Sequence, residues 1–97
     1  MTTTATKPSP IEKEKITGLK FPEKDVLVSQ EAVKIRMADL EKALKLGNLE
    51  HGKIRIIFED AESIMEVDTT IWGVTDKRVI LKQGVVIPIH RIHAVKV

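Results

Sequence analysis

The chain has 97 residues, a net charge of +2 and no cysteine. This length leaves room for one domain, and the lack of cysteine excludes a disulfide framework and the common zinc ribbons and fingers. No run of about 18 apolar residues is present and the N-terminus lacks the apolar stretch of a secretory signal, so we expect no transmembrane helix and a cytoplasmic location.

Residues 1–20 are rich in Thr, Lys, Pro and Glu and show no apolar period. This composition predicts a disordered leader. The remaining residues, 21–97, are then expected to form a single helix-plus-barrel domain. A core of this size gives only marginal stability, so burial of surface against a protein partner or a second copy is expected to add to it.

The spacing of apolar residues predicts a helix over 30–46. The stripe that would face the core consists of Val33, Met37, Leu40 and Leu44. Ser29 stands where an N-cap is expected, with Glu31 in the first turn, and Gly47-Asn48 are residue types that end helices. Ile35 falls beside the stripe and is read either as part of a partner surface or as an isolated exposed residue.

Residues 53–97 are typical of short strands separated by turns. Alternation places Ile54, Ile56 and Phe58 on the inner face of a strand over 53–59. A long strand over about 63–74 follows, with one face made of Met65, Val67, Thr69 and Ile71. Gly73 sits where such a strand can bend or bulge.

A turn at 75–77 then leads into a strand over 78–82 and a two-residue hairpin at Gln83-Gly84. The next strand, 85–89, contains Pro88, which indicates an edge or a strand end, and His90-Arg91 form a short turn before a last strand ending at Val97. Four or five antiparallel strands of this length give an α+β fold, with one N-terminal helix on a strongly bent sheet or small barrel.

The segment W-G-V-T-D-K-R-V-I-L-K-Q-G-V-V-I-P-I-H-R-I-H-A-V-K-V, residues 72–97, resembles part of the bacterial pleckstrin-homology-like domains. Those domains often read aromatic-x-Val-Thr-Asp-x-Arg, an apolar run, Gly, then Ile-Pro and a closing Ile. The resemblance is confined to these residues.

The order of helix then sheet, with T-D-K-R-V-I-L-K before I-H-R-I-H-A-V, also resembles the Sm-like fold, including the bacterial host-factor RNA chaperones. This resemblance implies an N-terminal helix on a five-stranded bent barrel, assembly into rings and RNA binding. It places Asp76 on the turn aspartate of the family and His90 on the histidine of its Tyr-Lys-His motif. Pro88 and Ile89 stand at the Tyr and Lys positions.

Charge is unevenly distributed: residues 53–75 hold two basic and five acidic groups, and residues 76–97 hold five basic groups and one acidic group. The candidate residues for binding nucleic acid or a protein partner are Lys77, Arg78, Lys82, His90, Arg91 and Lys96. Single-strand binders also use stacking aromatics, and this chain has only Phe21, Phe58 and Trp72. A solvated basic face is the alternative interpretation.

The first hairpin carries the acidic residues Glu59, Asp60, Glu62, Glu66 and Asp68. They are interpreted as solvated charges or as an attraction for the basic residues of a second copy. A divalent-ion or acid–base pair formed by Glu66 and Asp68, which project from the same face, is a further alternative. His90 and His93, with His51, lack an accompanying ligand motif and are expected at the surface or the sheet rim.

No catalytic motif is present, because the chain has no Cys or Tyr, no glycine-rich phosphate loop and no H-E-x-x-H. We therefore expect no enzyme activity, no cofactor and no metal site. The sequence predicts a non-catalytic protein-interaction or self-assembly module, forming a homo-oligomer or binding a protein partner, with no membrane association. The alternative is an Sm-like single-stranded RNA-binding protein whose salt-sensitive binding depends on Lys82, His90 and Arg91.

Overall fold

The computed structural model describes residues 8–50 and 53–96, with side chains placed for all of these except 48–50. The fold is α+β, as expected. The helices are α1 (Lys13–Ile16) and α2 (Gln30–Glu50), with 3-10 turns η1 (Lys82–Gly84) and η2 (Ile89–Arg91). The strands are β1 (Ser9–Pro10), β2 (Ile54–Glu59), β3 (Ile64–Thr69), β4 (Ile71–Val74), β5 (Arg78–Leu81), β6 (Val86–Pro88) and β7 (Ile92–Lys96).

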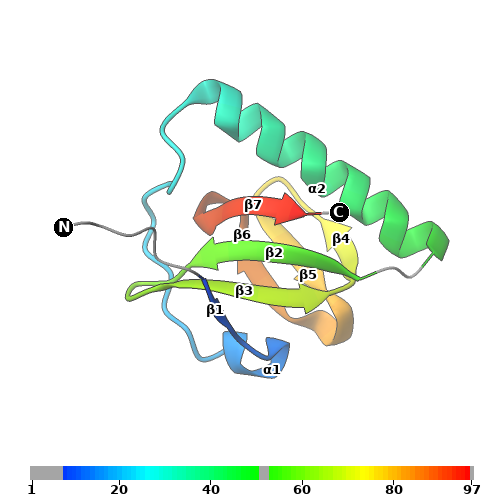
Figure 1. Cartoon of the computed structure of the whole chain (residues 1–97), viewed down its shortest axis with the longest axis horizontal. Helices are drawn as coiled ribbons and strands as arrows, with labels where there is room; N and C mark the ends of the chain where they lie inside the picture. Colours follow the sequence, from blue (N-terminus) through cyan, green and yellow to red (C-terminus); the bar gives the residue numbers. More distant parts are fainter. Residues whose placement is uncertain (1–7, 51–52, 97) are drawn as a thin grey trace.

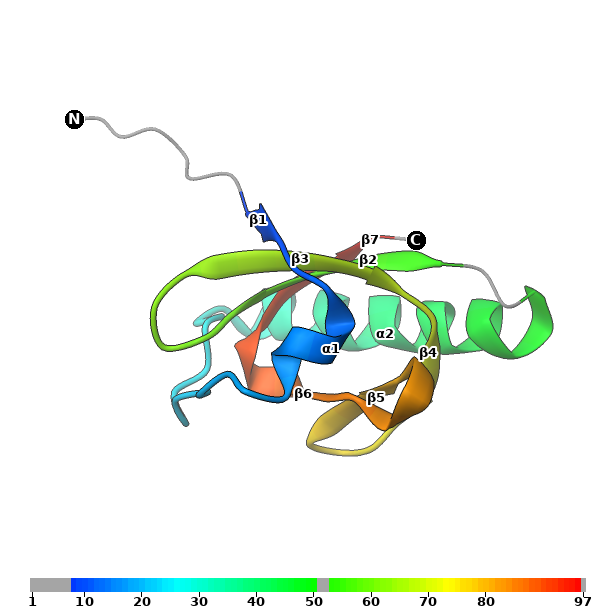
Figure 2. The ribbon, with the colours of Figure 1, turned by 90° about the horizontal axis from the view of Figure 1, so that it is seen from below.

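The described strands form two sheets, ordered β1-β3-β2-β7 and β4-β5-β6, which stay separate and do not close into a barrel. The sheets lie as two layers, with α2 along one open side and α1 on the opposite side (Figures 1 and 2). α2 packs against β4 and β7, so it contacts one strand of each sheet. The core between the layers contains the predicted inward residues of β2, Ile54, Ile56 and Phe58, all buried.

The long strand expected over 63–74 is divided into β3 and β4, and the chain passes from one sheet to the other between them. Its predicted inner face is confirmed, because Met65, Val67, Thr69 and Ile71 are all buried. The pairing of β4 with β5 shifts register between Ile71 and Gly73, which places a bulge where Gly73 was expected to cause one. This division, together with β1, gives more strands than the four or five expected.

Residues 8–20 are ordered, which corrects the expectation of a disordered leader over 1–20; residues 1–7 lie outside the described part of the chain. β1 pairs in parallel with β3, and Ile16 of α1 is only 1% exposed in the core. The single apolar residue of this short helix does not produce a period, so composition alone gave the wrong result. Phe21 continues the packing, its ring lying 6.1 Å from that of Phe58.

α2 begins at the predicted residue, Gln30, and extends beyond the predicted end of the helix. The hydroxyl of Ser29 accepts a hydrogen bond from the amide of Ala32 at 3.3 Å, which confirms the N-cap. Gly47-Asn48 do not end the helix, which continues to Glu50. A Cβ on Gly47 would overlap the backbone oxygen of Ile71, so this glycine instead permits the close crossing of α2 over β4.

The turn between β5 and β6 has three residues, not the two predicted. The amide of Leu81 donates to the carbonyl of Val85 at 2.7 Å, which leaves Lys82–Gly84 as the turn. Gln83 (φ 69) and Gly84 (φ 84) both adopt left-handed backbone. Pro88 ends the edge strand β6, as expected, and His90-Arg91 lie in the turn η2, after which β7 returns to pair with β2.

Candidate interaction surface

The six basic residues named from the sequence do not form one site. Lys77, Arg78 and His90 line an open groove of about 550 Å³ between the N-terminal half of α2 and the β5–β6 hairpin. Lys96 lines a separate hollow of about 320 Å³ on the other sheet. Lys82 is exposed in η1, and Arg91 is buried.

Arg91 and His90 both have hydrogen-bond partners within the chain. Arg91 is only 6% exposed. Its guanidinium donates to the carbonyl oxygens of Lys24 (2.6 Å), Glu59 (3.1 Å) and Asp60 (3.2 Å). His90 Nε2 lies 2.8 Å from the carbonyl oxygen of Pro22. Both side chains thus fasten the segment before α2 to the sheets, a role that satisfies buried backbone carbonyls.

The acidic residues of the first hairpin are also largely paired within the chain. Asp60 is buried, and its carboxylate accepts the amides of Glu62 and Ser63, both at 2.8 Å. Glu59 Oε1 lies 2.8 Å from His93 Nε2. Among the described residues, Glu62 is the only acid of this cluster whose carboxylate has no hydrogen bond or ion pair.

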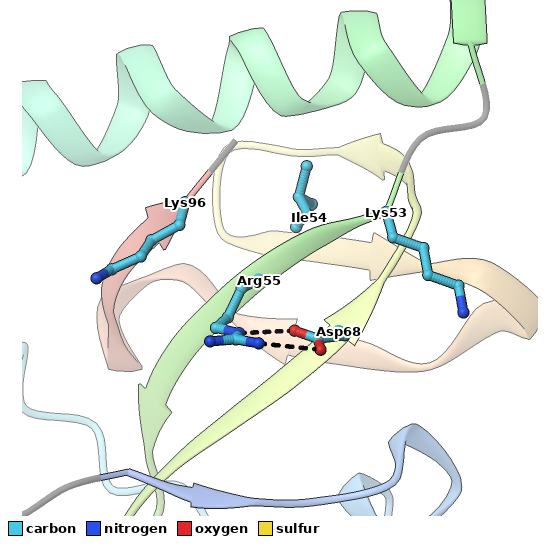
Figure 3. A pocket seen from close by; sticks show the side chains of 5 residues that line it. All are labelled: Lys53, Ile54, Arg55, Asp68 and Lys96. Atoms are coloured by element: carbon cyan, nitrogen blue, oxygen red, sulfur yellow. Dashed lines mark hydrogen bonds and ion pairs between the residues drawn. The ribbon is translucent and has the colours of Figure 1, made fainter.

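Arg55 engages the other two acids, and Figure 3 shows its contact with one of them, Asp68. Its guanidinium lies 2.8 Å from Asp68 and 3.2 Å from Glu66. The hydrogen bond from Arg55 lowers the pKa of the Asp68 carboxyl. Lys53 and Lys96 extend to either side of this pair, so the hollow has walls of mixed charge and its acids are already neutralised. Four of the five acids of this cluster therefore have partners within their own chain.

Sequence reasoning missed the buried ion pair at the start of α2. Arg36 is 5% exposed, and its two terminal nitrogens lie 3.0 and 2.9 Å from the carboxylate oxygens of Asp25. The same guanidinium donates to the carbonyl of Ile92 at 3.1 Å. The hydrogen bonds from Arg36 lower the pKa of Asp25. A signal was present in the sequence, because position 36 is three residues after Val33 and four before Leu40, on the apolar stripe.

Exposed apolar residues gather on the outer face of β4-β5-β6. Trp72 is 55% exposed and Val86 38% exposed. Ile80 pairs with Gly73 on one side and with Val86 on the other, so these positions form a row across the three strands. Trp72 is the residue that the bulge between Ile71 and Gly73 leaves without a partner on β5, and it precedes the glycine that lies opposite Ile80.

Two cations flank this row on β5. Arg78 stands two residues before Ile80 in β5 and so lies on the same side of the strand, and Lys82, two residues after Ile80, is the first residue of η1. Both are exposed, and among the described residues neither side chain has a hydrogen bond or an ion pair. We call the outer surface formed by these five residues the Trp72 face: Trp72, Arg78, Ile80, Lys82 and Val86.

No protein-family model, curated protein or solved structure matches this chain. Over residues 8–50 and 53–96, no helix combines the length and apolar character needed to cross a bilayer. The same residues contain no group of three or more His, Cys, Asp or Glu side chains arranged to hold a metal ion. His51 lies outside them. The surface chemistry of the chain is therefore the basis for a functional proposal.

Proposed function

We propose that this chain is a non-catalytic interaction module whose binding surface is the Trp72 face. The observation that carries the proposal is the exposure of Trp72, the only tryptophan of the chain, which precedes the glycine that lies opposite Ile80 in the row with Val86. Tryptophan and arginine are the residue types that most often dominate binding energy at protein interfaces. An exposed apolar row with cations at its rim is the arrangement that such interfaces use.

Self-assembly is one use that this face supports. A small domain gains stability when a second copy covers apolar surface, and burying a large apolar side chain is worth about 1.5–3 kcal/mol. The support now comes from the apolar row. It does not come from attraction between an acidic hairpin and a basic tail, because Glu59, Asp60, Glu66 and Asp68 have partners within their own chain.

The Sm-like alternative draws support from the order of the elements. A helix, a strand, a long strand that divides, a hairpin and a last strand returning to the first follow one another from α2 to β7. Its site residues receive less support, because the side chains of His90 and Arg91 are held by backbone carbonyls of the same chain. Of the three residues expected to bind RNA, only Lys82 is exposed.

The test is light scattering behind a sizing column, with the 260/280 nm absorbance ratio recorded on the same peak. Wild type is compared with Trp72→Ala and with Ile35→Ala, a matched control because Ile35 is 61% exposed on α2. We expect the wild type to elute as an assembly or with bound nucleic acid, and Trp72→Ala to lose that species while Ile35→Ala keeps it. An assembly or a nucleic-acid complex that Trp72→Ala leaves unchanged would overturn the proposal, as would a monomer that also fails to bind single-stranded oligonucleotides.

A further inference from the structure

We infer that the partner of the Trp72 face is single-stranded nucleic acid. This inference rests on the proposed function, because it concerns the same surface and names its occupant. Nucleic-acid single strands present two features together, flat bases with exposed π-faces and a backbone of negative charge. The Trp72 face offers the complement of both on one side of a three-stranded sheet.

The stacking partner is Trp72. Its side chain is the only exposed aromatic among the described residues, because Phe58 is fully buried and Phe21 packs against it. Stacking of a base on an aromatic side chain contributes substantially to binding and tolerates any base. The neighbouring Ile80 and Val86 add apolar surface against which the edge of a base or a sugar can lie.

The phosphate partners are Arg78 and Lys82. Arg78 is the first residue of β5, and Lys82 directly follows the last one. This separation of four residues corresponds to about 13 Å in an extended strand. Ile80, the residue beside the bulge that carries Trp72, stands midway between them. A nucleic-acid strand with one base stacked on Trp72 can thus place its phosphates against one cation on each side.

Charge also argues against a second copy as the occupant. Two copies packed through this face would bring Arg78 and Lys82 of one close to the same residues of the other. The five residues of this face include no acid, and three acids of the first hairpin are engaged elsewhere, Glu66 and Asp68 with Arg55 and Glu59 with His93. Like charges brought together at an interface are unfavourable, whereas a polyanion would neutralise both cations.

The experiment uses the full chain and three probes: fluorescein-labelled U12, fluorescein-labelled dT12 and a labelled 12-base-pair DNA duplex. Binding is followed by anisotropy, and independently by quenching of tryptophan fluorescence, which reports on Trp72 alone. We expect saturable binding of U12 and dT12, with quenching, and weaker binding of the duplex, whose bases are already stacked. The ratio of the U12 and dT12 affinities distinguishes RNA from DNA as the preferred strand.

Variants separate the contribution of base stacking on Trp72 from that of the phosphate contacts. Trp72→Ala is expected to weaken binding of the single strands about tenfold or more, and Trp72→Phe to retain most of the affinity. Arg78→Gln and Lys82→Gln should each reduce the slope of log affinity against log salt concentration by about 0.7. Lys34→Gln, an exposed lysine on α2, and Ile35→Ala are the matched controls and should change neither quantity.

The outcomes distinguish this inference from the proposed function. No saturable binding of U12 or dT12, or equal binding by Trp72→Ala, overturns the inference. If that result accompanies a nucleic-acid-free assembly that Trp72→Ala dissociates, a second copy occupies the face and the proposed function stands. If the protein is instead a monomer that binds neither oligonucleotide, both proposals fall.

Discussion

At the residue scale, the arginines of this chain differ sharply in what they do. Arg36 and Arg91 are buried and satisfy carboxylate or carbonyl oxygens, whereas Arg78 is exposed on the Trp72 face. Buried charges are tolerated only when they are paired and hydrogen-bonded. The two buried guanidiniums hold the irregular segment before α2 to the sheets, because Arg36 contacts Asp25 and Arg91 contacts Lys24.

Replacing Asp25 with Asn should destabilise the protein, because the Arg36 guanidinium would lose its anionic partner. Asp25 is about one third exposed, so solvent screening reduces the cost below that of a fully buried pair, and we expect about 1–3 kcal/mol from urea unfolding at pH 7. Asp39→Asn, which changes a carboxylate of α2 without a partner among the described residues, should cost less than about 0.5 kcal/mol.

The same pair predicts a pH dependence. Arg36 lowers the pKa of Asp25, so the folded state favours the ionised carboxylate. Its contribution should be fully present above the unfolded value of about 4 and be lost as the pH falls through the lower folded value. The difference in unfolding free energy between wild type and Asp25→Asn should thus stay constant from pH 7 to 5 and shrink below pH 4. A difference that is the same at pH 3 and pH 7 would contradict this assignment.

At the element scale, the crossing of α2 over β4 depends on Gly47. Alanine in a helix interior is normally more favourable than glycine by about 1 kcal/mol. Here the added methyl group would overlap the carbonyl oxygen of Ile71 and crowd the methyl group of Thr70, 3.2 Å away. Because backbone cannot move aside as a flexible side chain can, the helix must shift away from the sheet.

Gly47→Ala should therefore destabilise the protein, by about 1–3 kcal/mol, in place of the stabilisation expected from helix propensity. The midpoint of urea or thermal unfolding measures the effect. Gly18→Ala is the matched control, since a Cβ there would have only one ordinary contact, 3.9 Å from the carbonyl of Lys15. An increase in stability for Gly47→Ala would show that α2 and β4 do not approach as closely as described.

At the scale of the whole molecule, two sheets form the core only because other segments close its open sides. α2 covers one side and α1 the other (Figures 1 and 2). Ile16 reaches the core from α1, and Ile11, Leu19 and Phe21 pack against it from the flanking segments. Residues 8–21 are therefore structural parts of the domain.

Replacement of Ile16 by Ala should lower the free energy of unfolding by about 2–4 kcal/mol, the usual cost of removing a buried branched side chain. Lys15→Ala, one position earlier and exposed, should change it by less than about 0.5 kcal/mol. Unfolding of both variants in urea gives the comparison. Equal midpoints for Ile16→Ala and wild type would mean that α1 contributes nothing to the stability of the core.

The amino-acid sequence by itself determined the local features of this protein. The period of α2, the Ser29 cap, the inward residues of β2 and β3, and the bulge at Gly73 follow from patterns within a few residues. Those patterns are reliable because burial on one face and local hydrogen bonding depend on near neighbours. The fold class follows from their order along the chain.

Tertiary structure decided the rest, because it depends on residues far apart in the sequence. Only the packed fold shows that Gly47 lies against β4, that Ile16 belongs to the core and that Arg91 is buried. The Trp72 face likewise depends on strand register, which sets Gly73, the residue after Trp72, opposite Ile80 and sets Ile80 opposite Val86. Spacing along the chain cannot fix these contacts, since register and helix placement are settled by the burial of the whole core.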